Sequence, residues 1–248
     1  MNTPLFSCLA AALLAGAPIQ AASIGSAVTL ELRTERGPLA LYPAGGLRAY
    51  AEAVQGASYR IVVHNNLDRR VGLVIAVDGR NIISGARSWL KGDERMYVLA
   101  PFETREYAGW RTAQDKENRF YFTSVEDSYA GAFKDTSAMG VVAMAVYPER
   151  LAPARRPSQL SDAPAPAVAG KAQSRMAESA PQACTGYGEE VYSPSIAVAF
   201  DPEPQAREET FIKYEWRATL IKMGVIRDRP APRNRLWDPG FAPPPPRL

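Results

Sequence analysis

The sequence predicts a mainly β protein whose body, residues 23–150, is an antiparallel β-sandwich of about eight strands. Two observations favour this class. Apolar side chains recur at every second position in several short runs, which is the spacing of strands that bury one face. Clusters of Gly, Asn and Asp separate the runs, as is typical of turns between antiparallel strands. After the sandwich we expect a disordered linker over 151–185 and a C-terminal strand-plus-helix element over 186–226.

Each expected strand follows from the alternation in its own run. Val28, Leu30 and Leu32 alternate with polar residues, and the stretch 59–64 alternates in the same way. The other expected strands are 71–77, 96–100, 102–108, 119–124 and 139–147. The segment 47–54 also fits helical spacing, but glycines bracket it, so we expect a strand that enters a turn.

Two loops carry specific turn chemistry. Asp78-Gly79 directly follows a strand run, and this pair is a strong signal for a two-residue type I′ hairpin turn, in which both residues need a positive φ. The polar segment 65–68 is expected to form the loop between two earlier runs. We also expect the Asn81 side chain to bond the backbone of its own loop.

The composition changes abruptly after residue 150. Of the 32 residues from 152 to 183, 22 are Ala, Pro, Ser or Gln, and none is aromatic. Such a stretch buries too little apolar surface to offset the entropy of ordering it, so we predict a flexible linker over 151–185. The last segment, 227–248, contains seven prolines and is expected to be an extended, basic tail.

The predicted C-terminal element combines a strand and a helix. Ile196, Val198 and Phe200 alternate with other residues, which predicts a strand. From 207 to 226 an apolar stripe at helical spacing predicts an amphipathic helix, with two acids in its first turn and Gly224 near its end. Such a unit is too small to be stable alone, so we expect it to dock on the sandwich or on a partner.

Residues 1–22 have the pattern of a secretory signal peptide. An uncharged run over 5–17 is followed by small residues, after which we expect cleavage. An uncleaved anchor is the alternative, although the run is short for a membrane span. The mature chain would then lie in the periplasm or outer envelope. Cleavage removes Cys8 and leaves Cys184 as the only thiol, which is inert, paired with another chain, or reactive.

The composition excludes several classes of function. One His and two Cys cannot supply a poly-His metal site or a Cys-rich zinc or disulfide framework. A net charge of +3 is too weak for a dedicated nucleic-acid binder. No P-loop, dinucleotide-binding fingerprint or Gly-x-Ser-x-Gly motif occurs, so we expect no cofactor and no metal. His64 lies on the polar side of a strand run, where a surface or hydrogen-bonded imidazole is expected.

Aromatic residues concentrate in the second half of the predicted sandwich. Such rings either fill the core or stack on a ligand. Trp89 lies among polar residues of a loop and is the best candidate for a surface contact. Trp110 and Arg111 lie at a strand end, where the ring would cap the core, and they are further candidates for ligand or partner contact.

The C-terminal element supplies a second group of candidate contacts. Tyr214 and Trp216 belong to the predicted helix, and Trp237 belongs to the basic tail. Amphipathic helices bind grooves in partner proteins, and proline-rich segments bind aromatic-lined grooves. The arginines of the tail would suit acidic surfaces or lipid headgroups, so peripheral membrane contact stays open.

Paired carboxylates are the remaining enzymatic option. Asp115 and Glu117 follow 110–112, and Glu126 and Asp127 follow the strand at 119–124. A glycoside hydrolase needs two carboxyl groups about 5–10 Å apart across a cleft. Acids in loops beside strands are usually solvated, so we do not expect an enzyme.

A set of short motifs carries a family resemblance over about half of the chain. The motifs are Tyr59-Arg60-Ile61, Asn65-Asn66, 77–85, Tyr97-Val98-Leu99, Gly109-Trp110-Arg111-Thr112, Phe122-Thr123-Ser124, Asp127-Ser128-Tyr129-Ala130, 140–150, 186–190 and 213–217. Through them the chain resembles an uncharacterised family of exported β-rich envelope proteins of Gram-negative bacteria. The resemblance implies a single folded module and an envelope location. No activity is assigned to that family, so no catalytic residue carries over.

Together these patterns predict a non-enzymatic periplasmic or envelope interaction protein that binds a protein partner through the C-terminal helix and tail. The alternative is a glycan-binding module or a carboxylate-based glycan hydrolase that acts on cell-wall or surface polysaccharide. A concave groove lined by Trp89, Trp110 and two facing acids would favour the alternative. Burial of those rings in a closed sandwich would argue against it.

Overall fold

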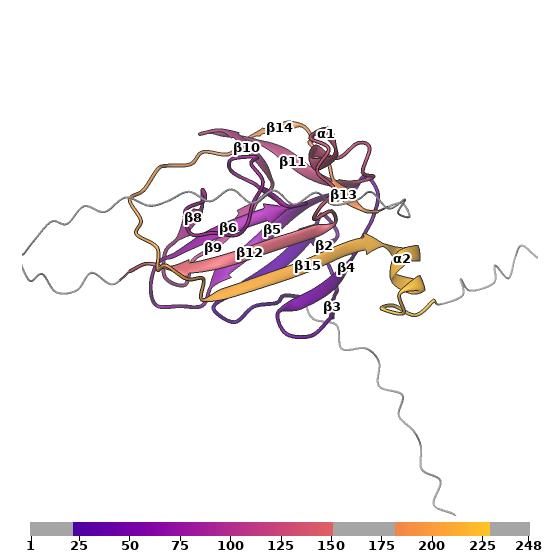
Figure 1. The fold of residues 1–248 in the computed structure, drawn as a ribbon, viewed down its shortest axis with the longest axis horizontal. Coiled ribbons are helices and arrows are strands. Elements are labelled where there is room, and N and C mark those ends of the chain that lie inside the picture. The colour runs from indigo at the N-terminus through magenta and orange to yellow at the C-terminus, as the bar shows by residue number, and fades with distance from the viewer. Residues whose placement is uncertain (1–21, 151–181, 229–248) are drawn as a thin grey trace, which may run out of the picture.

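The structure is a computed structural model that describes residues 22–150 and 182–228. In these residues strands dominate and form two sheets (Figure 1). The prediction of a mainly β sandwich is confirmed, with more strands than expected because several contain only two or three residues. The helices of the described chain are α1 (Tyr129–Ala132) and α2 (Arg217–Lys222).

The first sheet has the strand order β10-β11-β5-β1-β2, and the second has the order β3-β4-β15-β12-β6-β7. Among the described strand pairs, β15 and β4 are parallel and the others are antiparallel. The first sheet contains β1 (Val28–Thr34), β2 (Gly37–Pro38), β5 (Ser58–Asn65), β9 (Thr104–Tyr107), β10 (Gly109–Ala113), β11 (Lys116–Thr123), β13 (Cys184–Thr185) and β14 (Glu190–Tyr192). The second contains β3 (Leu41–Pro43), β4 (Arg48–Ala53), β6 (Val71–Val77), β7 (Arg80–Asn81), β8 (Tyr97–Leu99), β12 (Val141–Pro148) and β15 (Glu208–Trp216).

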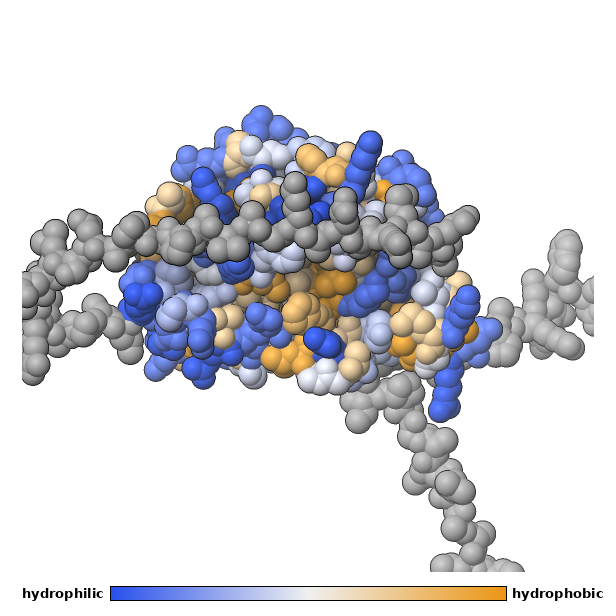
Figure 2. Space-filling view, in the orientation of Figure 1, coloured by the Kyte–Doolittle hydropathy of each residue, from blue (hydrophilic) through white to orange (hydrophobic). Residues whose placement is uncertain are grey.

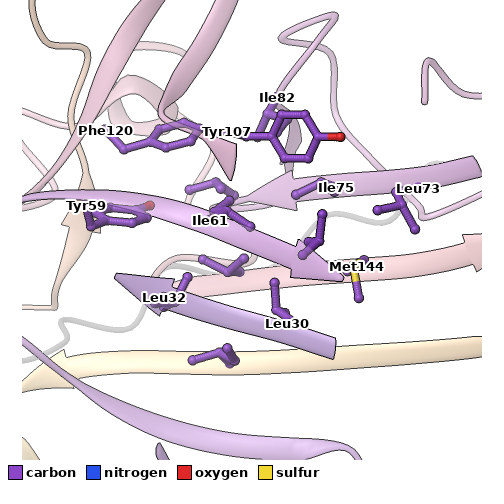
Figure 3. Close-up of a cluster of buried hydrophobic side chains, with 14 of the residues drawn as sticks. Leu30, Leu32, Tyr59, Ile61, Leu73, Ile75, Ile82, Tyr107, Phe120 and Met144 are labelled. Atoms are coloured by element: carbon purple, nitrogen blue, oxygen red, sulfur yellow. The ribbon is translucent and has the colours of Figure 1, made fainter. Parts of the chain in front are cut away.

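The core lies between the sheets and contains the alternating residues that the sequence indicates. Leu30 and Leu32 of β1 pair with Val63 and Ile61 of β5, and all four side chains are fully buried. Figure 3 shows the two leucines and Ile61 near Met144, which comes from β12 of the second sheet. Each of these burials stabilises the fold by about 1.5–3 kcal/mol relative to an exposed side chain.

The second sheet also buries part of its outer side, which explains why β6 is a continuous apolar run. All seven of its residues are buried. On the outer side Val74 clusters with Ala145 and Tyr147, and Leu90 and Met96 pack against this cluster. A strand covered on both faces has no polar side to show, so its sequence does not alternate. Figure 2 shows apolar residues towards the middle of one face and hydrophilic residues around them.

The turn chemistry follows the sequence closely. Asp78 and Gly79 join β6 to β7 with φ values of 49° and 76°, so the predicted type of two-residue hairpin turn is confirmed. The Asn81 side-chain oxygen accepts hydrogen bonds from two backbone N–H groups of its own loop, as expected. Residues 66–70 connect β5 to β6, so the loop expected over 65–68 is present, although Asn65 still belongs to β5.

The predicted helix over 207–226 is wrong for most of its length. Residues 208–216 form β15, and only the six residues of α2 are helical. β15 lies between β4 and β12 and forms hydrogen bonds along both edges, and this tertiary pairing outweighs any local helical preference. Its buried positions include Glu208 and Thr210, whose polar side chains hide the alternation that would have indicated a strand.

Glu208 is buried because it holds the start of the described chain. Its carboxylate accepts hydrogen bonds from the backbone N–H groups of Ser26, at 3.0 Å, and Ala27, at 2.9 Å. Gly25 has a φ of 114°, and a Cβ at this position would lie 2.1 Å from the Val28 carbonyl oxygen. Only glycine therefore allows the backbone to turn around this carboxylate.

The described chain resumes at residue 182, before the predicted end of the linker at 185. Ala183 and Cys184 are fully buried, and β13 pairs with the end of β11. These residues follow a compositionally biased stretch, so their burial depends on contacts that the local sequence does not reveal.

The strand expected around 196–200 does not form. Ile196 and Val198 are exposed, and the chain there has an irregular path. Phe200 instead lies over Gly72 of β6, where a Cβ would approach its ring to 2.6 Å. The segment 196–200 therefore runs along the surface, where Phe200 packs on β6 and no neighbouring strand of the described chain pairs with the segment.

The C-terminal element docks on its own sandwich, in which β15 is a central strand of the second sheet. It is therefore part of one fold with residues 23–150 and not a separate attachment. The predicted signal peptide up to residue 21, the linker segment 151–181 and the tail from 229 lie outside the described residues. No helix in the described part of the chain is long and apolar enough to cross a membrane.

Candidate binding site

A hollow of about 500 Å³ opens beside α1. Its walls come from residues of the loop after β7, from β10, from the segment 126–133 that contains α1, and from Tyr187, which follows β13. Figure 1 shows α1, β10 and β13 in the upper part of the molecule. Four stretches that are distant in sequence therefore form this surface together.

Trp110 forms a rigid floor for the hollow. Its side chain is only 2% exposed, and its Nε1–H donates a hydrogen bond to the Gly186 carbonyl oxygen at 3.0 Å. Phe120 packs against the indole edge-on at 5.3 Å, and Tyr129 covers it at 4.3 Å between ring centroids. The ring is thus held on three sides and supports the residues above it.

Two exposed aromatic rings flank Tyr129. Tyr187 stacks on Tyr129 with centroids 5.5 Å apart, and Phe133 meets Tyr129 edge-on at 5.1 Å. Phe133 is 55% exposed and Tyr187 is 45% exposed. The Arg80 guanidinium lies 4.0 Å from the centroid of the Phe133 ring, which fixes that ring by a cation–π contact.

The local sequence explains why α1 places Tyr129 and Phe133 on one side. Ser128 caps the helix, since its hydroxyl accepts a hydrogen bond from the Gly131 N–H at 3.0 Å and donates to the Val125 carbonyl at 2.8 Å. A Cβ on Gly131 would lie 2.1 Å from that carbonyl oxygen, so glycine is needed for the tight cap. Residues four apart in a helical turn are neighbours, which brings the two rings together.

Negative charge dominates the polar lining of the hollow. Glu126 and Asp127 are exposed and have no ion-pair partner among the described residues. Arg111 also lines the hollow, but its guanidinium pairs with the buried Glu117 carboxylate. Arg80 lies 3.9 Å from the Asp135 carboxylate. Asp135 also binds Arg87 at 2.9 Å, and Arg80 is not among the residues that line the hollow. The arginine of the lining, Arg111, is therefore neutralised by Glu117, whereas the two acids remain available.

The geometry of these acids does not match glycoside hydrolysis. Glu126 and Asp127 are sequence neighbours on one side of the hollow, whereas hydrolysis needs carboxyl groups on opposite sides of the bond. Hydrogen bonds from its own backbone N–H and from Ser124 lower the pKa of Glu126, which keeps the group ionised and unsuited to donate a proton. The carboxylates suit the binding of a cationic group instead.

A buried chain of hydrogen bonds holds β13, and with it the residues that lead to Tyr187. The Asp78 carboxylate accepts from the backbone N–H groups of Gly140 and Thr185, each at 2.7 Å, and from the Tyr214 hydroxyl at 2.6 Å. Because Tyr214 donates to Asp78, it accepts from the Thr185 hydroxyl at 2.6 Å, which in turn accepts from Tyr59 at 2.7 Å. Every hydroxyl proton in this chain is used, so the network links both sheets without an unpaired donor.

Burial raises the pKa of Asp78 from 3.8 to about 6, and the three donors oppose this rise. A carboxyl with a raised pKa in the fold binds its proton more tightly there than in the unfolded chain. The proton-linked part of its contribution to stability is therefore greatest below pH 4 and is lost as the pH rises through 6, whereas the ionised carboxylate still accepts the three hydrogen bonds. We expect the stability advantage of the wild type over Asp78→Asn to be about 2 kcal/mol larger at pH 4 than at pH 7.

The measurement for this prediction is urea-induced unfolding of both proteins at a series of pH values. The asparagine variant lacks the titrating group, so the difference between the two curves isolates Asp78 from other carboxyls. A difference that grows from pH 4 to pH 7 would show that the sign is wrong.

The structure separates the six residues that sequence reasoning selected as contacts. Trp110 and Arg111 line the hollow, Trp110 as its buried floor and Arg111 through its side chain next to Glu117. Trp89 is 70% exposed, as expected for a surface ring, but it does not line the hollow. The shared groove of Trp89 and Trp110 that would favour the glycan alternative is therefore not formed.

The other three selected residues do not form a helical contact surface. Tyr214 is fully buried in β15, so it is unavailable to a partner. Trp216 ends β15 and packs, partly buried, against the core. Trp237 lies outside the described residues.

The surroundings of the other candidate residues, His64 and Cys184, indicate structural roles. His64 lies on β5, and its Nδ1 is 2.8 Å from the Thr104 hydroxyl, consistent with the expected hydrogen-bonded surface imidazole. Cys184 is fully buried with its Sγ 3.4 Å from the Met139 Sδ, and burial raises its thiol pKa strongly. This environment fits an inert thiol and gives another chain no access to it. Among the described residues, no group of His, Cys, Asp and Glu is arranged to hold a metal ion.

Phe133 and Tyr187 carry most of the exposed aromatic surface of the hollow and were not predicted from the sequence. Glycines flank Tyr187 on both sides, and neither supplies a side chain that would cover the ring. Ser128 and Gly131 mark a helix cap three residues apart, which would have placed Phe133 at the end of a helical turn. These signals were present, but they do not indicate that the two rings meet.

Comparison with protein-family models, curated proteins and solved structures returned no match for this chain. The fold and the site define a two-sheet β-sandwich with an aromatic and acidic surface hollow. Its function is therefore inferred from the chemistry of the hollow itself.

Proposed function

We propose that this chain is an exported, non-enzymatic interaction protein of the cell envelope and that the hollow beside α1 binds its protein partner. The observation that carries the proposal is the pairing of exposed Phe133 and Tyr187 rings with the Glu126 and Asp127 carboxylates. Exposed aromatic anchors on a rigid support are typical of interaction hot spots. The carboxylates favour a partner segment with basic side chains.

This site replaces the partner helix that the sequence suggested. α2 has only six residues, and its Leu220 is buried against the sandwich. It therefore has no long apolar stripe to insert into a groove. In the proposed complex the sandwich therefore supplies the groove, and the partner supplies the peptide.

Glycan binding is the second candidate, and the stacked pair of Tyr129 and Tyr187 is the observation in its favour. Flat aromatic faces next to carboxylates can hold a sugar ring through stacking and hydrogen bonds. Trp89 and Trp110 do not form the shared groove that would favour glycan binding, because Tyr129 covers Trp110 and Trp89 lies outside the hollow. The protein partner is the better supported ligand.

The experiment is chemical crosslinking of the mature protein in intact cells, followed by purification and mass spectrometry. We expect the double variant Phe133→Ala/Tyr187→Ala to lose the crosslinked partner. The matched control is Trp89→Ala/Tyr192→Ala, which removes two exposed rings outside the hollow. Equal loss in both variants, or retention in both, would contradict the proposal, and a polysaccharide adduct would select the glycan candidate.

A further inference from the structure

The hollow and the C-terminal tail of the same chain have matching chemistry. The tail, residues 229–248, contains seven prolines, including the run Pro243 to Pro246, and four arginines. We propose that this tail is an intramolecular ligand of the hollow, where its prolines pack on the aromatic rings and its arginines pair with the carboxylates. The inference rests on the proposed function and names one occupant of that site.

The prolines of the tail suit the aromatic rings of the hollow because of the way proline-rich segments are recognised. Such segments bind shallow grooves lined by aromatic side chains, because the rings of proline pack flat on them and little conformational entropy is lost. Phe133 and Tyr187 flank Tyr129 and present this kind of surface. The buried Trp110 below keeps it rigid.

The charges of the tail and of the hollow are also complementary. The tail carries four arginines and a single acidic side chain, Asp238. Of the charged residues that line the hollow, Arg111 is paired with the buried Glu117 carboxylate, so the groups left for a ligand are Glu126 and Asp127. An arginine next to the proline run, such as Arg247, would meet an acid while the prolines meet the rings.

The tail also starts within reach of the hollow. The described chain ends at residue 228, just after α2, which follows β15. Near the end of β15, the Tyr214 hydroxyl is hydrogen-bonded to Thr185. The next residue, Gly186, accepts a hydrogen bond from Trp110 in the floor of the hollow. Figure 1 shows α2 and α1 towards the same side of the molecule, with β13 between them. Twenty residues in a polyproline conformation span about 60 Å, whereas a domain of this size is about 40 Å across.

Intramolecular occupancy would make the hollow selective. A tethered segment has an effective concentration in the millimolar range, so an external partner must displace it to bind. The interaction would therefore be strongest with partners that offer a better proline- and arginine-containing segment, and the free tail would then be released.

The test is site-specific photo-crosslinking in the full mature chain, with benzoylphenylalanine in place of Ala242 so that every proline is kept. Equal amounts of normal and ¹⁵N-labelled protein are mixed before irradiation. We expect crosslinked peptides that join the tail to residues 126–133 or to Tyr187 and that carry a single isotope. Crosslinks between the two isotopes would show a second copy as the occupant and overturn the proposal, as would crosslinks scattered over the surface.

Charge variants make the test quantitative. In the crosslinking chain, Glu126→Lys/Asp127→Lys should lower the yield of the hollow crosslink by about fivefold or more. The control Glu35→Lys/Asp68→Lys changes the net charge equally at two exposed acids outside the hollow and should leave the yield unchanged. An equal fall in the yield of the hollow crosslink in both double variants would overturn the proposal. If the tail misses the hollow while Phe133→Ala/Tyr187→Ala still loses its partner in cells, only this inference fails and the proposed function stands.

Discussion

Replacement of Asp78 by alanine is expected to lower the free energy of unfolding by about 3–5 kcal/mol at neutral pH. The substitution removes the acceptor for three buried donors, the Gly140 and Thr185 N–H groups and the Tyr214 hydroxyl. A buried donor without a partner costs about 1–3 kcal/mol, and the three costs are not fully additive. Chemical denaturation monitored by tryptophan fluorescence measures the change.

Asp68→Ala is the matched control, because Asp68 is exposed in the loop before β6 and should change stability by less than about 0.5 kcal/mol. Hydrogen exchange gives a second measurement. Because Asp78 holds β13, the amides of Thr185 and Gly186 should lose protection more than those of β1. A loss of stability below about 1 kcal/mol would show that the network does not hold the sheets together.

The second large effect concerns the buried pair of Arg111 and Glu117. The Arg111 guanidinium also donates to the Tyr97 hydroxyl at 2.8 Å and to the Ser193 carbonyl at 2.8 Å, so it ties the chain after the linker to the β10–β11 hairpin. Arg111→Met leaves the Glu117 carboxylate buried and unpaired, which is expected to cost about 3–5 kcal/mol. Glu117→Leu should have a cost of similar size.

The double variant Arg111→Met/Glu117→Leu should lose much less than the sum of the two single costs, since neither charge is then left alone. A double-mutant cycle measured by urea unfolding gives this coupling free energy, which we expect to exceed about 2 kcal/mol. The exposed pair of Arg119 and Glu189 provides the comparison, with an expected coupling below about 1 kcal/mol. Similar couplings for both pairs would contradict the assigned role of burial.

Much of the sandwich could be predicted from local patterns. The strands β1 and β5 alternate cleanly because one face of each meets the core and the other meets water. The Asp78-Gly79 turn was predictable because few residue pairs accept two positive φ angles. In these cases the conformation of each residue depends mainly on its own type and on the few residues next to it in sequence.

The errors arise where the fold depends on distant contacts. The helix predicted over 207–226 is wrong because the apolar residues of this segment also fit helical spacing, while the inward-facing Glu208 and Thr210 of β15 are polar and hide the strand alternation. The Glu208 carboxylate is satisfied by the N–H groups of residues 26 and 27 and by the Ser26 hydroxyl. The end of the linker was misplaced because the burial of Cys184 depends on pairing with β11 across a large gap in sequence. Neither partner is visible from the local sequence.

The candidate site was only partly predictable for the same reason. Trp110, Arg111, Glu126 and Asp127 were all selected for their chemistry, and the structure places them around one hollow. The partner of these residues, Tyr187, lies beyond the linker and enters the hollow only because β13 pairs with β11. Sequence therefore indicated the kinds of residue, whereas the tertiary fold decided which of them meet.

The central claim is that the hollow beside α1 is the binding site, and photo-crosslinking from Tyr187 in intact cells tests it most directly. The crosslinking amino acid replaces Tyr187 in one chain and Tyr192, which is more exposed but outside the hollow, in another. We expect a discrete adduct from position 187 that is absent from position 192 and is lost on addition of Phe133→Ala. The same adducts from both positions, or an adduct from position 192 alone, would contradict the claim.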